Sequence, residues 1–394
     1  MKFGKSLALV AVLAIATVGF AQQKPEEKPA EAKVEEKVPE KPKLSVGGLA
    51  YIEWSKELKH SSTKRNPDEN YNTFAIKRVY LDFKKKLDDM WSVRVTTDVG
   101  QVDAKSDKKY TADGETTPNN VESKTNGYTV FLKYAYIEAK DKLDFAEYKF
   151  AFGMISTPLI GFVDKQSDYR WLEQNYADQA KTVLYDKTGK GQSIDNSADM
   201  GVSLEVSMFN KLLTITGAMT NGEGYKYADE VKLGDDGKAY YGMLTIMPVK
   251  DLYLVGIYRY QDTNDKIGDN YNKYMGGGVV YSDEWYKIGA MYYMPETSSK
   301  KLTDTTATEN KYKLFDSWLN VRLDQIVDMP VIVVGRYAFG ENKDVDKSKV
   351  TSWAAGIGYH VADGLRAVAY FQNVKSEALD DPDRQIFVKT EVKF

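Results

Sequence analysis

The sequence predicts an all-β protein, a transmembrane antiparallel β-barrel of about 16 strands that follows a disordered, charged N-terminal spacer. Three observations predict this fold class. Apolar residues recur at every second position in short segments across residues 44–394, which is the period of a strand. Tight turns and long polar connections alternate between these segments, as they do in outer-membrane barrels. An export signal stands at the N-terminus.

Residues 1–21 have the parts of a secretory signal peptide. Lys2 and Lys5 precede an apolar core at Leu7–Val18, and small residues surround a cleavage point after Ala21. The alternative is a single anchoring helix, but 12 apolar residues are fewer than the roughly 20 that span a bilayer. No later run is long and apolar enough either, which argues against a helical membrane protein.

Residues 22–43 form the predicted periplasmic spacer. They contain six Lys, six Glu and four Pro, and no aromatic residue. Such a segment cannot bury enough surface to offset its chain entropy. We therefore expect an extended, solvated tether. A handle for the cell wall or for a periplasmic partner is the functional alternative.

The barrel itself is predicted at residues 44–394. Tight connections such as Lys250–Asp251 indicate periplasmic turns, and long ones such as Asn221–Lys238 indicate outer loops. An even strand count returns the chain to the side on which it began. The predicted strands are 44–58, 72–84, 91–102, 128–139, 146–155, 198–209, 212–221, 239–249, 252–262, 273–282, 285–295, 312–325, 330–341, 351–361, 365–375 and 384–394.

Each strand has two chemically different faces. In the last one, Val388 and Val392 share a side, whereas Lys389 and Glu391 share the other. We expect apolar faces to contact lipid and polar faces to contact water in the lumen. Aromatic residues gather at strand ends, where they form interfacial girdles: Trp54, Tyr71, Trp91, Tyr128, Tyr281, Trp285 and Trp353.

The chain ends in Phe394, on an alternating last strand. A terminal aromatic in this context resembles the sorting signal that the outer-membrane barrel-assembly machinery reads. We therefore predict that this machinery is a partner and that the protein lies in the outer membrane of a Gram-negative-type bacterium. The alternative is that the chain ends in Phe by coincidence.

A 16-stranded barrel encloses an aqueous lumen that its own side chains do not fill. The longest connection, residues 156–197, is predicted to fold inward and form a constriction, because its position after the fifth strand resembles that of the constriction loop of general porins. A connection of this length is usually functional or disordered, and its mix of Pro, aromatic and charged residues favours an ordered loop. The alternative is an outer surface loop. Its charged candidates are Asp164, Lys165, Asp168, Arg170 and Glu173.

Arginine is scarce: six of the nine arginines lie inside predicted strands, and Arg384 stands at the first position of the last one. A charge facing lipid at mid-bilayer costs about 2–4 kcal/mol, so we expect these side chains to face inward and set the field of the pore. Asp82, Asp98 and Asp324 are acidic neighbours on the same faces, and the alternative is a wall of structural ion pairs. The candidate pore-lining residues are Arg78, Arg94, Asp98, Arg259, Arg322, Arg336 and Arg366.

Several segments resemble the phosphate-selective porin O and P family. They are Phe74–Phe83, Leu87–Arg94 with Asp98, Lys133–Ile137, Phe152–Pro158 and Asp168–Glu173. The resemblance implies a trimeric outer-membrane diffusion channel for small ions or solutes, phosphate or other anions among them. The loop departs from that family, because residues 156–197 contain six acidic and five basic residues and form no basic funnel.

The composition argues against other classes of function. There is no Cys, and His60 and His360 are the only histidines, so we expect no metal site, no cofactor and no catalytic constellation. A net charge of −3 does not favour nucleic-acid binding. We therefore predict a porin for passive diffusion with an anion preference, and no enzyme. The alternative is a structural anchor that tethers the envelope through its spacer.

Overall fold

The computed structural model is a closed barrel of 16 antiparallel strands in which each strand pairs with its neighbours in sequence and β1 pairs with β16. It describes residues 44–59, 72–102, 127–187, 189, 191–225, 237–262, 270–299, 307–324 and 329–394. The predicted signal peptide, the spacer, His60 and Tyr71 lie outside these residues. The predicted barrel is confirmed.

The strand bounds agree closely with the alternating pattern in the sequence. No helix among the described residues is both long and apolar enough to cross a bilayer. The strands are β1 Leu44–Lys59, β2 Asn72–Lys86, β3 Trp91–Val102, β4 Gly127–Leu143, β5 Ala146–Ser156, β6 Ala198–Met208, β7 Leu213–Thr220, β8 Ala239–Val249, β9 Leu252–Asp262, β10 Tyr271–Ser282, β11 Tyr286–Ser299, β12 Thr308–Arg322, β13 Val331–Asn342, β14 Val350–Ala362, β15 Leu365–Ser376 and β16 Asp383–Lys393.

The barrel closes where the two ends of the chain meet. The Phe394 amide donates to the Gly48 carbonyl at 3.0 Å, and the Gly48 amide donates to the Phe394 carbonyl at 2.6 Å. A Cβ at Gly48 would lie 2.1 Å from the Phe394 ring, so a larger residue there would displace that side chain. The Phe394 side chain itself is 69% exposed, on the outside of the barrel. Its predicted role as an assembly signal stays a prediction.

The outer face is apolar and exposed, as expected for lipid contact. On β14, Ile357 and Tyr359 are exposed, and on β16 Val388 is exposed while Lys389 and Glu391 are buried. The inner face departs from the expectation of uniform polarity. From β10 to β15 it carries buried aliphatic and aromatic side chains such as Met291 and Leu314.

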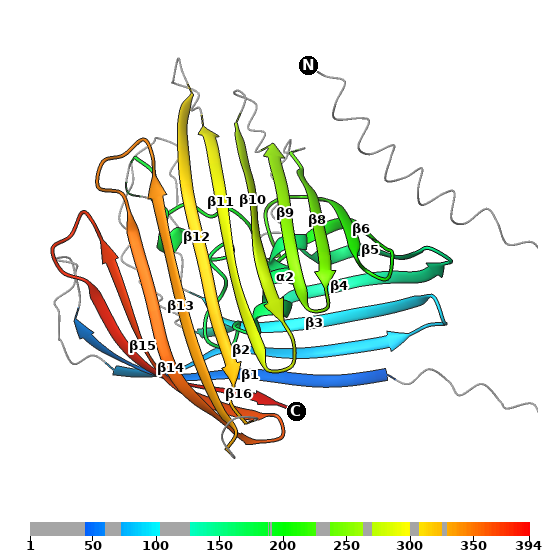
Figure 1. Ribbon diagram of the computed structural model, residues 1–394, viewed down its shortest axis with the longest axis horizontal. Coiled ribbons are helices and arrows are strands. Elements are labelled where there is room, and N and C mark those ends of the chain that lie inside the picture. Colours follow the sequence, from blue (N-terminus) through cyan, green and yellow to red (C-terminus); the bar gives the residue numbers. More distant parts are fainter. Residues whose placement is uncertain are drawn as a thin grey trace, which may run out of the picture.

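Those inward apolar residues are covered by the segment between β5 and β6. This segment contains α2 (Pro158–Ser167) and a 3-10 turn, η1 (Ala180–Thr182). Figure 1 shows α2 inside the ring of strands. Its side chains and those of β10–β15 form one hydrophobic cluster. The core of the protein therefore lies within the barrel, against one half of its wall.

A charge on the outer face tests the assignment of faces. Ile357 is the eighth of the 13 residues of β14 and is exposed. Ile357→Lys is expected to lower the free energy of unfolding by about 2–4 kcal/mol, because the ammonium would face hydrocarbon. Urea titration in lipid vesicles, followed by tryptophan fluorescence, measures this. Ser55→Lys is the matched control, since Ser55 lines an internal cavity. An equal loss in both variants would contradict the assignment.

Candidate functional site

The segment 157–197, called the inner loop below, leaves and rejoins the wall at one point. The Thr157 hydroxyl donates to the Asn196 carbonyl at 2.5 Å, and the Thr157 amide donates to the Ser197 carbonyl at 3.4 Å. Pro158 stands at the first position of α2, where no amide hydrogen is needed. The loop is therefore closed at its neck and projects into the lumen.

The inner loop is held against one half of the wall by apolar packing. Its fully or almost fully buried side chains meet inward-facing residues of β10–β15. Burial of each large aliphatic side chain contributes roughly 1.5–3 kcal/mol. On the loop these residues are Leu159, Ile160, Val163, Leu172, Val183, Leu184 and Ile194, and on the wall they include Met291, Leu314, Ile332, Val334 and Val368.

Arg336 on β13 is the central polar anchor of the inner loop. Its guanidinium donates to Asp316 on β12 at 2.8 and 3.0 Å, to Glu173 at 3.2 Å and to the Gln174 carbonyl at 2.6 Å. The ring of Tyr176 lies 4.3 Å from the guanidinium carbon. Because Arg336 is buried under the loop, it holds the loop in place and does not line open lumen.

Arg366 on β15 anchors the end of α2. Asp168 is the C-cap of α2 and adopts a left-handed conformation with φ 47°. Its carboxylate accepts two hydrogen bonds from Arg366, at 2.5 and 2.9 Å. Burial raises the pKa of Asp168, but the hydrogen bonds and charge of Arg366 outweigh this effect and hold the pKa below its ordinary 3.8.

Arg259 on β9 anchors the far end of the loop. It is 1% exposed and lies 3.7 Å from Asp195. Tyr241 and Tyr274 donate to the same carboxylate at 3.0 and 2.7 Å. Arg259 therefore faces inward as predicted but is covered by the loop, so it does not line a water-filled path.

Arg170 lies on the open side of the inner loop. It pairs with Asp164 at 2.7 Å and with Asp178 at 2.9 Å. Across from it, Arg78 on β2 pairs with Asp98 on β3, and Tyr225 hydrogen bonds to both. Arg170 and residues of β1–β4 therefore line the same cavities, and the predicted constriction at this place stays a prediction.

Arg94 and Arg322 lie nearer the short turns. Arg94 donates to Asp82 at 2.7 Å, and Arg322 donates to Asp324 at 2.7 Å. Lys165 is exposed and lines a separate cavity of about 740 Å³ beside β4–β9. His360 stands on β14, and the charges of Arg322 and Arg366 act on it.

Two cavities lie on the open side of the lumen. One, of about 640 Å³, is lined by β1, β2, β15, β16 and the loop. The other, of about 470 Å³, lies between β1–β4 and the loop, toward the short turns. Arg170 lines both, so it marks the position where they approach each other.

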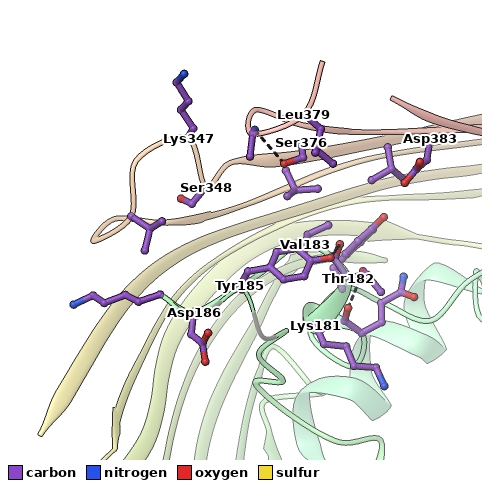
Figure 2. Close-up of a pocket in the computed structure, with 18 of the residues that line it drawn as sticks. Lys181, Thr182, Val183, Tyr185, Asp186, Lys347, Ser348, Ser376, Leu379 and Asp383 are labelled. Carbon is purple, nitrogen blue, oxygen red and sulfur yellow. Dashed lines mark hydrogen bonds between the residues drawn. The ribbon is translucent and has the colours of Figure 1, made fainter. Parts of the chain in front are cut away.

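A further cavity, of about 1050 Å³, lies toward the long loops. Figure 2 shows it between the loop residues Lys181–Asp186 and the strand connections that carry Lys347, Ser348 and Leu379. It shares Glu173, Gln179, Gln372 and Gln385 with the 640 Å³ cavity. The two spaces form the entrance on the side of the long loops.

The structure thus divides the predicted arginines into two groups. Arg259, Arg336 and Arg366 fix the inner loop, together with Asp168 and Glu173. Arg78, Arg94, Asp98, Asp164 and Arg170 gather on the open side. Lys133, a buried lysine on β4, was not among the predicted pore-lining residues, because that prediction rested on arginines. Lys389, which the alternation of the last strand placed on the lumen side, is also buried.

No family model and no curated protein matches the sequence. Solved structures do match. An anion-selective porin from Comamonas acidovorans has a TM-score of 0.58 at 10% identity, covering 90% of this chain and 100% of that one. The outer-membrane channel DcaP of Acinetobacter baumannii has a TM-score of 0.57 at 10% identity, covering 91% and 99%. OmpF of Salmonella typhi has 0.57 at 10%, covering 90% and 98%. These likenesses show a porin-type barrel fold, and the resemblance to the phosphate-selective family stays a prediction.

Removal of the central anchor is expected to be costly. Arg336→Met leaves the buried carboxylate of Asp316 without its cation, which typically costs about 3–5 kcal/mol. Arg322→Met is the control, because Arg322 is partly exposed and pairs with Asp324 alone, so the loss should stay within about 1 kcal/mol. Urea denaturation and protease cleavage within residues 157–197 measure both effects. Equal stability of the two variants would refute the anchoring role.

The anchor at Asp168 predicts a pH dependence. Because the folded pKa lies below 3.8, its stabilising contribution is present above about pH 3.8 and is lost as pH falls through the folded value. Trp171, which stacks on Arg366 at 4.4 Å, is the reporter. The fluorescence of Trp171 is obtained by subtracting the spectrum of the Trp171→Phe variant from that of the wild type. This emission should stay constant from pH 8 to about 4.5 and change below about pH 4. Asp168→Asn should abolish that step. A transition near neutral pH would contradict this assignment.

Proposed function

We propose that the protein is a porin. It forms a water-filled channel through the outer membrane of a Gram-negative-type bacterium and lets small hydrophilic solutes and ions diffuse passively. The observation that carries this proposal is the half-filled lumen. A closed barrel with an apolar exterior holds a loop against one wall, and cavities lined by charged side chains remain along the other.

The charges beside these cavities favour anions. Among the side chains that line the 470 Å³ cavity, five are basic and two are acidic: Lys84, Arg94, Lys133, Arg170 and Lys393 against Asp82 and Asp164. The 640 Å³ cavity has four basic and two acidic ones: Lys77, Arg78, Arg170 and Lys389 against Glu53 and Glu173. A positive excess near a low-dielectric wall raises the local concentration of anions.

A homotrimer belongs to the same proposal. The resemblance of residues 70–175 to the phosphate-selective porins implies it, and the porin-type fold is consistent with it. Specificity for phosphate is not part of the proposal. The balanced charge of the inner loop differs from the basic funnel that such specificity would need.

Planar-bilayer recording tests the function. The purified protein should insert with stepwise conductance, in triplets if it is trimeric. Under a KCl gradient the reversal potential should shift from zero toward the equilibrium potential of chloride. Cation preference would overturn the anion assignment alone. An absence of conductance from folded, inserted protein would overturn the porin assignment and favour the structural anchor.

A further inference from the structure

Lys133 is an unusual residue of the open side. It lies at a bulge in β4, where Thr96 pairs with Tyr134 and Thr97 pairs with Leu132, so Lys133 has no partner in the ladder. The bulge turns Lys133 and Tyr134 toward the lumen together. The side chain of Lys133 is 3% exposed. A buried ammonium in this position needs compensation from its surroundings.

The compensation comes from tyrosines. The ammonium donates to the Tyr80 hydroxyl at 3.1 Å. It lies 4.7 Å from the ring centroid of Tyr80, 5.5 Å from that of Tyr134 and 5.6 Å from that of Tyr225. Ring faces attract a cation but do not neutralise it. The charge of Lys133 therefore persists in the cavity.

The neighbouring cations differ from Lys133 in this respect. Arg78, Arg94 and Arg170 each pair with at least one carboxylate. Across the described part of the chain, no carboxylate lies within 4 Å of the Lys133 ammonium, whose contacts are the tyrosines. An ammonium has three N–H donors, and Tyr80 accepts from one. Lys133 thus retains both a positive charge and donors for a further partner.

The cavity beside Lys133 has the size and lining of a small-molecule site. Its volume of about 470 Å³ falls within the range of ligand pockets. Leu49, Tyr80 and Tyr134 give it apolar and aromatic surface, while Lys133 and Arg170 give it positive charge. Such a site combines an anchor for one negative group with a surface for a hydrocarbon body.

We propose that this cavity is a binding site for small organic monocarboxylates with an aromatic or short apolar body, and that Lys133 is its specificity-determining residue. The carboxylate accepts from the Lys133 ammonium, and the body lies against the rings of Tyr80 and Tyr134. A doubly charged anion is a poorer ligand, because its second charge would compete with Asp82 and Asp164 for Arg94 and Arg170. This inference rests on the proposed channel function.

The test uses sodium benzoate, sodium acetate and inorganic phosphate as blockers of the chloride current through single channels. Benzoate should reduce the current at roughly tenfold lower concentration than phosphate, and acetate should be intermediate. Lys133→Met should weaken the benzoate block by about tenfold or more, because a charge-assisted hydrogen bond is lost. Lys133→Arg should retain it. In the Tyr134→Leu variant, benzoate and acetate should block the current at similar concentrations, because the aromatic contact is lost.

Lys140→Gln is the matched control. Lys140 lies on the same strand, lines the 740 Å³ cavity and pairs with Glu138 at 2.6 Å, so its variant should bind benzoate as the wild type does. Circular dichroism and stepwise conductance establish that each variant is folded and open. The inference would be overturned, and the channel function would stand, if phosphate blocked the current more strongly than benzoate. The same holds if benzoate blocked the Lys133→Met variant as strongly as the wild type. A wild type without conductance would instead refute the channel itself.

Discussion

A closed ring of 16 strands encloses more space than its inward-facing side chains can fill, and the rest of this structure follows from that constraint. The segment 157–197 occupies part of the space. It carries its own apolar residues, and the strands beneath it, β10–β15, present apolar side chains in place of the polar ones that a water-filled lumen favours. The result is a barrel with a hydrophobic core on one side and cavities lined by charged side chains on the other.

The charged residues take their roles from this division. Under the loop, cations and carboxylates are buried together. A buried charge without a hydrogen-bonded partner of opposite sign would destabilise the fold. Arg336 with Asp316 and Glu173 shows this matching most fully. On the open side, the rings and hydroxyl groups of tyrosines surround the Lys133 ammonium. There a cation such as Lys133 can remain without a carboxylate, and the lining keeps a positive excess.

The strands could be predicted because the residues that face lipid must be apolar, which produces the alternation along each strand. On β14 the outward-facing residues are apolar whatever occupies the lumen: Trp353, Ile357 and Tyr359. The predicted strand 351–361 therefore differs from β14 by one residue at each end. An inward course of the connection 156–197 could be proposed from its position after the fifth strand. Its packing could not, because the apolar residues of the loop and of the wall are far apart in sequence.

The roles of the arginines could not be predicted for the same reason. Arg78 and Arg259 occupy similar alternating strands, yet one lines a cavity and the other is covered. The difference is made by Asp195, which lies 64 positions before Arg259. Lys133 was not predicted because the candidate cations were arginines, and a bulge interrupts the alternation at that residue. The local sequence pattern predicts which side of a strand faces the lumen. Whether the inner loop covers a side chain there depends on tertiary contacts.

The central claim is that the inner loop fills one half of the lumen and leaves the other half open. Substituted-cysteine accessibility tests it most directly, because the chain has no native cysteine. Ser55→Cys lies beside the 640 Å³ cavity, and Ala354→Cys lies on β14 beneath the loop. A cationic methanethiosulfonate reagent should react with Ser55→Cys and reduce the channel current, and it should leave Ala354→Cys unmodified. Equal reaction at both positions would show that the loop does not cover that wall.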